Sequence, residues 1–345
     1  MNGREVLIIG GKGYFGRFLA EDLRTHAGIV ATIGGRSGPI VADLRDRDSL
    51  EAALRNIAVV ICAAGPYQTM PTTLPELCIR RGIHYIDLSD DRDFVNKVRA
   101  LVPIESDNLP AICSGWSTVP ALSGLLTQIG IAGQDRVNSI HIHMTAGSRG
   151  ARNRATIESL MHSVGQRFTL FRDGQATTVL GGSEPRAFVF PPPIGKRNGF
   201  LVNVPDLNLF PNLFQARTVE FRAGSELWIL NAAVSALAQV ARTGLVKDWV
   251  FCSGFMRQAA AMLSGLGHDW GAVGVEVHGA LARRVSVIAE QNAPRIAVMP
   301  ASVMTAAILS GEDIRGWVSP ANWITPGRLR DECRKRGFQL IVEEL

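Results

Sequence analysis

Near its N-terminus the chain carries the stretch Val6-Leu7-Ile8-Ile9-Gly10-Gly11-Lys12-Gly13-Tyr14-Phe15-Gly16. Its four apolar residues predict a buried strand, and apolar residues between Phe15 and Leu23 recur at helical spacing after the glycines. A second apolar run, residues 29–33, completes a β-α-β unit. The motif G-x-G-x-x-G therefore lies where a strand ends and a helix begins, and there backbone N–H groups and the helix dipole can meet a pyrophosphate.

Each glycine of this motif has an expected role. Gly11 allows the tight turn, Gly13 lets the backbone approach the phosphates without a Cβ, and Gly16 lets the helix pack closely on the sheet. A Walker loop is excluded, because Lys12 is followed by glycine rather than by Ser or Thr. The residues predicted to contact a dinucleotide here are Gly11, Gly13, Tyr14, Phe15 and Gly16.

The residues after the second strand indicate which dinucleotide is bound. They read Ile33-Gly34-Gly35-Arg36-Ser37 and include no carboxylate for the ribose 2′-hydroxyl of NAD. Arg36 can form two parallel hydrogen bonds with a 2′-phosphate and Ser37 can add a hydroxyl, so NADP(H) is the predicted cofactor. The alternative is a solvated loop arginine. Asp43 and Leu44 are candidates to flank the adenine, although Asp43 fits a turn equally well.

The remaining pattern predicts two architectures. Short apolar runs alternate with amphipathic segments up to about residue 125, which is typical of an α/β Rossmann fold with a doubly wound parallel sheet. Strict alternation over residues 139–144 predicts a half-exposed strand, and Asp173-Gly174 predicts a hairpin. Residues 191–199, with three prolines, are expected to be irregular.

We therefore predict an NAD(P)-binding domain over residues 1–125 and a second α+β domain, built on a mixed or antiparallel sheet, over residues 126–300. The second domain is expected to serve substrate binding and dimerisation, and residues 300–345 are expected to pack back on the first domain.

The composition argues against several functions. Of 345 residues, 46% are hydrophobic and 19% charged, enough for a sizeable core. The net charge of +5 comes without a basic stripe, so nucleic acid is not an expected partner. The longest uncharged stretch, residues 111–134, contains a proline and four glycines, so no membrane span is expected. Five cysteines without a close pair and no export signal predict a reduced, cytoplasmic location, and no metal site is expected.

Two further stretches are distinctive: Val59-Val60-Ile61-Cys62-Ala63-Ala64-Gly65-Pro66-Tyr67 and Gly82-Ile83-His84-Tyr85-Ile86-Asp87-Leu88-Ser89. Together with the glycine stretch and, more faintly, residues 115–123, they resemble the saccharopine dehydrogenase (saccharopine reductase) family of NADP-dependent oxidoreductases. The resemblance is firm over residues 1–125 and diffuse beyond them. It implies hydride transfer between NADPH and a carbon–nitrogen bond of an amino-acid-derived anionic substrate, and a homodimer.

One segment departs from that family. Saccharopine-forming relatives often carry Gly-x-Asp-Pro-Gly where this chain has Gly115-Trp116-Ser117-Thr118-Val119, so a hydroxyl replaces the carboxylate expected near the substrate amine. This argues against saccharopine itself as the substrate. The same broad family also resembles trans-acting enoyl reductases, which reduce a carbon–carbon bond. A catalytically silent NADP-binding protein is the third possibility, because the sequence offers no convincing proton donor.

Ligands of a doubly wound sheet bind beyond the carboxyl ends of its strands, which selects the turns after the fourth, fifth and sixth strands. Ala64, Gly65 and Pro66 are expected beside the cofactor, although a structural turn has the same sequence. Tyr67 and Ser117 are the catalytic candidates, with packing against the nicotinamide favoured over proton donation for Tyr67. For the substrate the candidates are Trp116, Thr118, Arg149, Arg152 and Arg154, whose alternatives are turn residues and a solvated loop.

Overall fold

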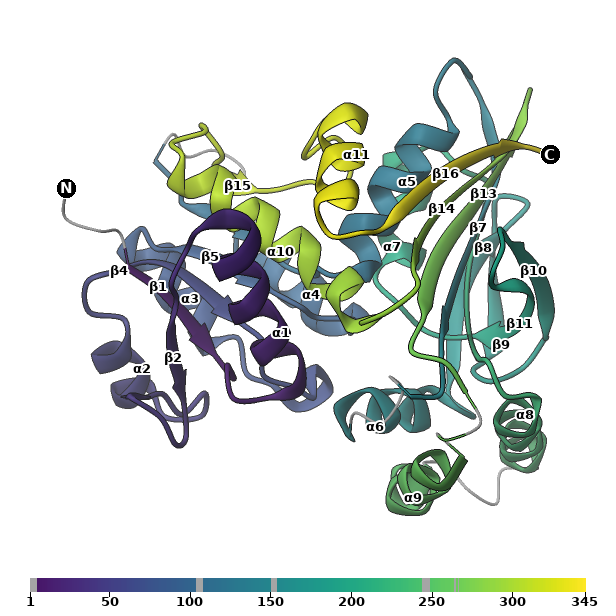
Figure 1. Ribbon diagram of the computed structural model, residues 1–345, viewed down its shortest axis with the longest axis horizontal. Helices are drawn as coiled ribbons and strands as arrows, with labels where there is room; N and C mark the ends of the chain where they lie inside the picture. The colour runs from purple at the N-terminus through teal and green to yellow at the C-terminus, as the bar shows by residue number, and fades with distance from the viewer. Residues whose placement is uncertain (1–4, 104–107, 150–153, 244–248, 264, 266) are drawn as a thin grey trace. The chain divides into compact units, whose positions relative to one another are not determined.

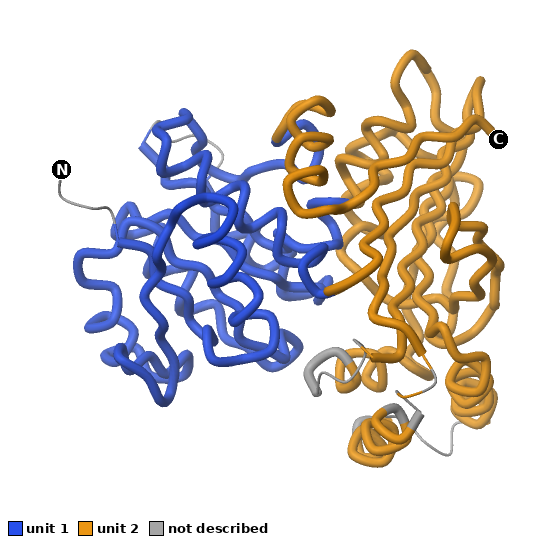
Figure 2. The backbone as a smooth tube through the Cα atoms, in the orientation of Figure 1, with its two compact units in different colours: residues 1–122, 294–323 blue, residues 123–293, 324–345 orange. Residues whose placement is uncertain are grey.

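A computed structural model describes residues 5–103, 108–149, 154–243, 249–263, 265 and 267–345, apart from some side chains at the edges of these ranges. By its internal contacts the chain forms two compact units (Figure 2). Unit 1 contains residues 1–122 and 294–323, and unit 2 contains residues 123–293 and 324–345. The segment 324–345 thus belongs to unit 2, whereas the sequence placed it with the first domain. The functional roles assigned to the two domains stay predictions.

Unit 1 is a doubly wound sheet of seven parallel strands in the order β15-β6-β5-β4-β1-β2-β3, which confirms the predicted Rossmann architecture (Figure 1). Its strands are β1 (Glu5–Ile9), β2 (Thr32–Gly35), β3 (Ile40–Val41), β4 (Ile57–Cys62), β5 (His84–Asp87), β6 (Ala111–Cys113) and β15 (Gly316–Trp317). Its helices are α1 (Tyr14–Asp22), α2 (Arg47–Ala53), α3 (Thr73–Arg81), α4 (Arg92–Ala100) and α10 (Pro294–Leu309).

Both faces of this sheet are buried, which explains why its central strands are continuous apolar runs. Leu7 and Ile9 of β1 face a core shared with α2, α3 and α4. Val6 and Ile8 point the other way, into a core shared with α1 and α10, which lie side by side (Figure 1). The returning segment 294–323 therefore completes the second face.

Unit 2 is α+β and is built on a mixed sheet, as predicted, with the path β10-β11-β12-β7-β13-β14-β16 and β8 and β9 branching from β12. Strands β12 and β7 are parallel, and the β7–β13, β13–β14 and β14–β16 pairs are antiparallel. Its strands are β7 (Val137–Ala146), β8 (Arg167–Arg172), β9 (Gln175–Leu180), β10 (Arg186–Phe190), β11 (Gly195–Leu201), β12 (Thr218–Ser225), β13 (Gly271–Gly279), β14 (Ala282–Ala289) and β16 (Gln339–Glu344). Its helices are α5 (Ser123–Gly130), α6 (Arg154–Ser163), α7 (Asp206–Leu213), α8 (Trp228–Arg242), α9 (Ser253–Leu263) and α11 (Pro326–Lys335). No helix of the described residues has the length and apolar character to cross a membrane.

The predicted hairpin is confirmed, because Asp173 and Gly174 join β8 to β9 with φ values of 51° and 79°. The prediction of a half-exposed strand over residues 139–144, which form part of β7, is only partly right. Its polar face is covered at His143, which is 2% exposed and stacks on Phe188 of β10 with 4.9 Å between the ring centroids, whereas Ser139 and His141 are half-buried. The prediction of an irregular segment over residues 191–199 is wrong from Gly195 onward, because β11 starts there and pairs with β10.

Strand β2 lies further along the chain than the apolar run 29–33 indicated. Val30 is 83% exposed, and the strand starts at Thr32. The register is fixed at its end, where the Gly10 N–H donates to the Gly34 carbonyl over 2.9 Å. Arg36 consequently follows the strand directly.

A buried acid links two helices of unit 2. Asp206, the first residue of α7, is fully buried and accepts a 2.5 Å hydrogen bond from the Ser123 hydroxyl at the start of α5. Burial raises the pKa of Asp206 to about 7, although the hydrogen bond from Ser123 opposes this shift. The folded protein therefore holds the proton of Asp206 more tightly than the unfolded chain does.

This raised pKa predicts a pH-dependent stability. The stabilising contribution is complete below the ordinary pKa of 3.8 and is lost as the pH rises through about 7. We expect Asp206→Asn, which is neutral at every pH, to remove this loss when the free energy of unfolding is measured by denaturant titration across that range. Asp173→Asn, at an exposed acid of the same unit, is the matched control and should keep the wild-type slope. Parallel pH profiles for the wild type and Asp206→Asn would contradict the assignment.

Candidate functional site

The turn between β1 and α1 is closed by a contact that only glycine allows. A Cβ on Gly16 would lie 2.3 Å from the Gly10 carbonyl oxygen, and one on Gly13 would lie 2.9 Å from the same atom. That oxygen also accepts a 2.8 Å hydrogen bond from the Gly13 N–H. The first turn of α1 therefore packs directly against the end of β1.

The sequence assigned the tight turn to Gly11, but the residue with left-handed backbone is Gly10, with φ of +83°. A Cβ on Gly10 would lie 2.7 Å from the Ala64 backbone nitrogen, in the turn after β4. A Cβ on Gly11 would instead meet the Ile33 side chain of β2 at 2.6 Å. Gly10 lies just before the motif. Its position directly after an apolar strand was the sequence signal that could have identified it as the turn residue.

The N-terminal end of α1 suits an anion. The first N–H groups of a helix have no acceptor inside the helix. Here the N-cap is Gly13, which offers no side-chain cap, and the first turn contains no acidic residue. Tyr14 and Phe15 are half-buried beside it, and their rings contact each other edge to face at 5.2 Å. A pyrophosphate would supply the missing acceptors, so the turn fits the predicted dinucleotide.

Two cations lie at the adjoining loop after β2. Arg36 and Ser37 are exposed there. The Lys12 Cε atom comes within 4.0 Å of the position that a Cβ on Gly38 would occupy, so the Lys12 side chain extends to the same loop. In the part of the chain that the structure describes, neither Lys12 nor Arg36 forms an ion pair. Sequence reasoning missed Lys12, although a lysine inside the glycine motif was a visible signal.

Asp43 and Leu44 lie in the turn after β3. The Asp43 carboxylate accepts a 3.0 Å hydrogen bond from the Arg45 N–H, and its carbonyl accepts another from the Asp46 N–H. Leu44 packs against the core cluster of unit 1. These contacts agree with the turn role considered for Asp43, and the adenine contacts stay predictions.

The turn after β4 lies beside the glycine turn. Ala63 donates from its N–H to the Ile9 carbonyl over 2.8 Å, and Ala64 contacts Gly10 as described above. Gly65 and Pro66 follow and are exposed. The turns after β1, β2 and β4 therefore meet at one edge of the sheet, where a dinucleotide is expected.

Tyr67 is buried and its hydroxyl is fully engaged. The hydroxyl donates a 2.7 Å hydrogen bond to the Cys62 carbonyl and accepts a 3.1 Å bond from the Leu88 N–H, which ties the ends of β4 and β5 together. Burial raises the pKa of Tyr67 well above its usual value, and the nearby Cys62 and Asp87 raise it further. This geometry gives Tyr67 a positioning role and leaves no free hydroxyl hydrogen for a substrate.

The turn after β6 is organised by Asp87. Its carboxylate accepts hydrogen bonds from the N–H groups of Ser89 (2.9 Å) and Gly115 (2.8 Å), and burial raises its pKa. Gly115 has φ of +78°, and a Cβ there would lie 2.4 Å from Pro120 Cδ, so the turn requires glycine. Asp87 is therefore a structural hydrogen-bond acceptor.

The three predicted substrate and catalytic residues of this turn differ in how far they are exposed. Trp116 is fully buried in the core of unit 1 and packs on Trp323, with 5.7 Å between the ring centroids. Thr118 is 7% exposed, whereas Ser117 is half-exposed. Ser117 is thus the accessible side chain of the three, and its catalytic role stays a prediction.

The predicted arginine cluster is only partly visible. Arg149 follows β7 and is exposed. Arg152 lies outside the described residues, and so does the side chain of Arg154, the first residue of α6. Their proposed contacts with substrate acid groups stay predictions.

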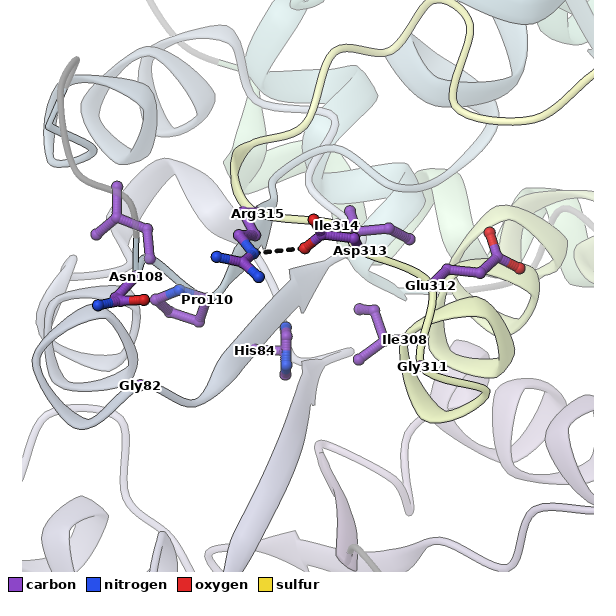
Figure 3. A pocket seen from close by; sticks show the side chains of 11 residues that line it. Gly82, His84, Asn108, Pro110, Ile308, Gly311, Glu312, Asp313, Ile314 and Arg315 are labelled. Atoms are coloured by element: carbon purple, nitrogen blue, oxygen red, sulfur yellow. Dashed lines mark hydrogen bonds and ion pairs between the residues drawn. The ribbon is translucent and has the colours of Figure 1, made fainter.

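A polar pocket of about 420 Å³ lies at the opposite, amino edge of the unit 1 sheet (Figure 3). His84 at the start of β5 lines it, together with Asn108, Pro110 and the Asp313–Arg315 ion pair. The His84 Nδ1 accepts a 3.0 Å hydrogen bond from the Ala111 N–H and so joins β5 to β6. Because dinucleotides bind at the carboxyl edge, this pocket is separate from the candidate cofactor site.

No family model matches the chain, and no curated protein matches it. Many solved structures are similar to the chain at low identity, among them three dehydrogenases. An engineered D-amino acid dehydrogenase is 13% identical with a TM-score of 0.46, covering 97% of this chain and 99% of its own. A C. glutamicum DAP dehydrogenase in complex with DAP is 13% identical with a TM-score of 0.44, covering 96% and 98%. An amine dehydrogenase from Mycobacterium smegmatis is 9% identical with a TM-score of 0.42, covering 92% and 95%.

The engagement of Tyr67 can be tested directly. We expect Tyr67→Phe to lower the free energy of unfolding by about 1–3 kcal/mol, because the Leu88 N–H and the Cys62 carbonyl lose a buried partner. Hydrogen exchange should show faster exchange of the Leu88 amide. The Trp116 amide, which donates to the Asp87 carbonyl over 2.7 Å, is the internal control and should keep its protection. An unchanged Leu88 amide would contradict the hydrogen bond.

Proposed function

We propose that the protein is an NADPH-dependent oxidoreductase of the saccharopine dehydrogenase type, acting on a carbon–nitrogen bond of an amino-acid-derived anionic substrate. The single observation that carries this proposal is the pairing of an uncapped helix N-terminus with two unpaired cations at the carboxyl edge of the sheet. The helix end is that of α1, and the cations are Lys12 and Arg36. Together they offer one site for a pyrophosphate and another for a 2′-phosphate.

The charges of this edge favour NADPH over NADH. An NAD site places a carboxylate at the end of the second strand, where it accepts hydrogen bonds from the ribose hydroxyls. Here the strand ends in Gly34 and Gly35, and Arg36 and Ser37 come next. A phosphate between Arg36 and Lys12 would be neutralised by both cations, and an unphosphorylated ribose would leave both of them unpaired.

Bound NADPH would supply the hydride and its electron pair. The chain would hold the pyrophosphate on the amides of the glycine turn and the 2′-phosphate on Lys12, Arg36 and Ser37. The exposed Gly65 and Pro66 would line the path toward the nicotinamide, and Ser117 would offer a hydroxyl to the substrate. Placement of the reacting atoms is the main contribution expected from such a protein. Homodimerisation and a cytoplasmic location belong to the same proposal.

One observation favours a second candidate, a catalytically silent NADP-binding protein. At the carboxyl edge of the described part of unit 1, the Tyr67 hydroxyl and the Oδ1 atom of the Asp87 carboxylate are already engaged in hydrogen bonds with the backbone. Steady NADPH consumption with cyclic imines as substrates would exclude this candidate. Consumption with a carrier-bound enoyl chain would instead support a carbon–carbon reductase.

The cofactor assignment predicts a selective loss of affinity. Arg36→Ala should weaken NADPH binding by about 10- to 100-fold, because a charge-assisted hydrogen bond contributes about 1.5–3 kcal/mol, while NADH binding stays nearly unchanged. Lys12→Gln should act in the same direction with a smaller effect. Calorimetric titration with each nucleotide measures these changes.

Arg24→Ala is the matched control, because Arg24 is an exposed arginine of the same unit beyond the end of α1. It should leave both affinities unchanged. Equal losses of NADPH and NADH binding in Arg36→Ala would show that Arg36 does not contact the 2′-phosphate. An absence of heat with either nucleotide in the wild type would overturn the proposed function.

A further inference from the structure

A second group of side chains that can bind a ligand or exchange a proton lies within unit 2, at one end of its sheet. Ser148 follows the end of β7, and Glu226 follows the end of the parallel strand β12. His268 and Trp270 immediately precede β13, which runs antiparallel to β7. This topology brings residues far apart in the sequence to the same sheet end, and a backbone hydrogen bond from the Gly147 N–H to the Trp270 carbonyl (2.7 Å) joins the two segments.

Glu226 and His268 form a hydrogen-bonded carboxylate–imidazole pair. The Glu226 Oε1 atom is hydrogen-bonded to Nδ1 of His268. Its Oε2 atom accepts from the N–H groups of His268 (2.9 Å) and Ser148 (3.1 Å). Burial alone would raise the pKa of Glu226, but these hydrogen bonds outweigh it and lower the pKa. Glu226 is therefore a carboxylate with fixed orientation.

The bend that brings these groups together depends on Gly267. A Cβ there would lie 2.6 Å from Glu226 Oε2 and 2.6 Å from the Ser148 Cβ. The Glu226 side chain is 9% exposed, whereas that of His268 is 70% exposed. With Nδ1 held by Glu226, Nε2 is the ring nitrogen left to exchange a proton with a ligand. A carboxylate on Nδ1 fixes the ring and stabilises the imidazolium, which is the arrangement general acid–base catalysis uses.

A half-buried cation, Arg197, lies against the Trp270 ring and donates from one terminal nitrogen to the Lys196 carbonyl over 2.8 Å. The Arg197 guanidinium of β11 lies 4.8 Å from the centroid of the Trp270 ring, and the His268 ring stacks on that indole at 6.2 Å. Burial lowers the pKa of Arg197, against the opposing attraction of Glu226. Its Nε atom is buried without an acceptor, and none of the described carboxylates forms an ion pair with it. A partly buried guanidinium without a counter-ion is suited to an anion.

We propose that this cluster is a binding site for the carboxylate of a small organic acid, with Arg197 holding the acid group and His268, oriented by Glu226, exchanging a proton with the ligand. The substrate class rests on the proposed function. Protonated His268 would give a proton to the ligand from Nε2 and become neutral, and neutral His268 would take a proton back.

The anion site is tested with succinate as the probe and uncharged succinamide as its control, using calorimetry on the full chain without nucleotide. We expect succinate to bind at millimolar concentrations and succinamide not to bind. Arg197→Gln should weaken succinate binding at least about tenfold, the loss of one charge-assisted hydrogen bond. Arg167→Gln, at an exposed arginine of β8, is the matched control and should leave it unchanged. Wild-type protein that binds neither probe, or equal binding by the wild type and Arg197→Gln, overturns the site.

The proton-exchange role is tested by NMR titration of the His268 ring, assigned with His268→Asn. The charged groups around this ring are Glu226, Arg197 and the neighbouring Asp269, whose carboxylate accepts from the Asn292 N–H over 3.1 Å. Addition of succinate should move the ring nitrogen signals of His268, and Glu226→Gln, which removes the carboxylate that fixes the ring, should reduce this movement. Ring nitrogen signals of His268 that succinate does not move overturn the role of His268.

A final measurement separates this inference from the proposed function. NADPH titration of Arg197→Gln and His268→Asn should give the wild-type affinity, because the nucleotide residues belong to unit 1. Succinate binding in a protein that fails to bind NADPH would overturn the proposed function and support the anion site. NADPH binding without succinate binding would support the proposed function and overturn the anion site.

Discussion

The contact between the Gly10 carbonyl and the first turn of α1 is the constraint on which the nucleotide-binding edge depends. There is no space for a Cβ at Gly16 or Gly13, so the helix starts directly on the strand and its amide end stays uncapped. The Gly10 N–H in turn sets the register of β2 through Gly34, which places Arg36 at the strand end. The backbone contacts of Gly10 thus position both the amides of the glycine turn and the Arg36 cation, which a phosphorylated nucleotide would meet.

Features set by neighbours along the chain could be predicted from the sequence. The β-α-β unit, the Asp173-Gly174 hairpin and the parallel and mixed sheets follow from apolar spacing and from turn residues, and the structure has all of them. Features set by contacts between segments far apart in the sequence could not be predicted from it. Strand β11 forms because β10 pairs with it, although three prolines precede it. The Tyr67 hydroxyl is engaged by Leu88, 21 residues further along the chain, and no local pattern signals that contact.

The same distinction between local and distant contacts applies to the candidate site. Arg36 and the glycines are recognisable because they follow a strand at fixed spacing, while Lys12 becomes relevant only when its side chain is seen to extend to the loop of Gly38. His268 and Glu226 are 42 residues apart, in segments with no motif, and they meet because two strands of the unit 2 sheet end together. The sequence therefore indicated a nucleotide site and left the proton donor unassigned. His268, for which we propose proton exchange with a ligand, lies in unit 2.

The interleaving of the two units has a consequence for biosynthesis. Helix α10 and strand β15 cover and extend the Rossmann sheet, yet they are encoded after residues 123–293. A nascent chain leaving the ribosome therefore exposes the part of one sheet face that α10 covers until residues 123–293 have emerged. Neither unit corresponds to one continuous stretch of the gene, so moving residues 1–122 to another gene as a single block would leave the part of the face under α10 exposed.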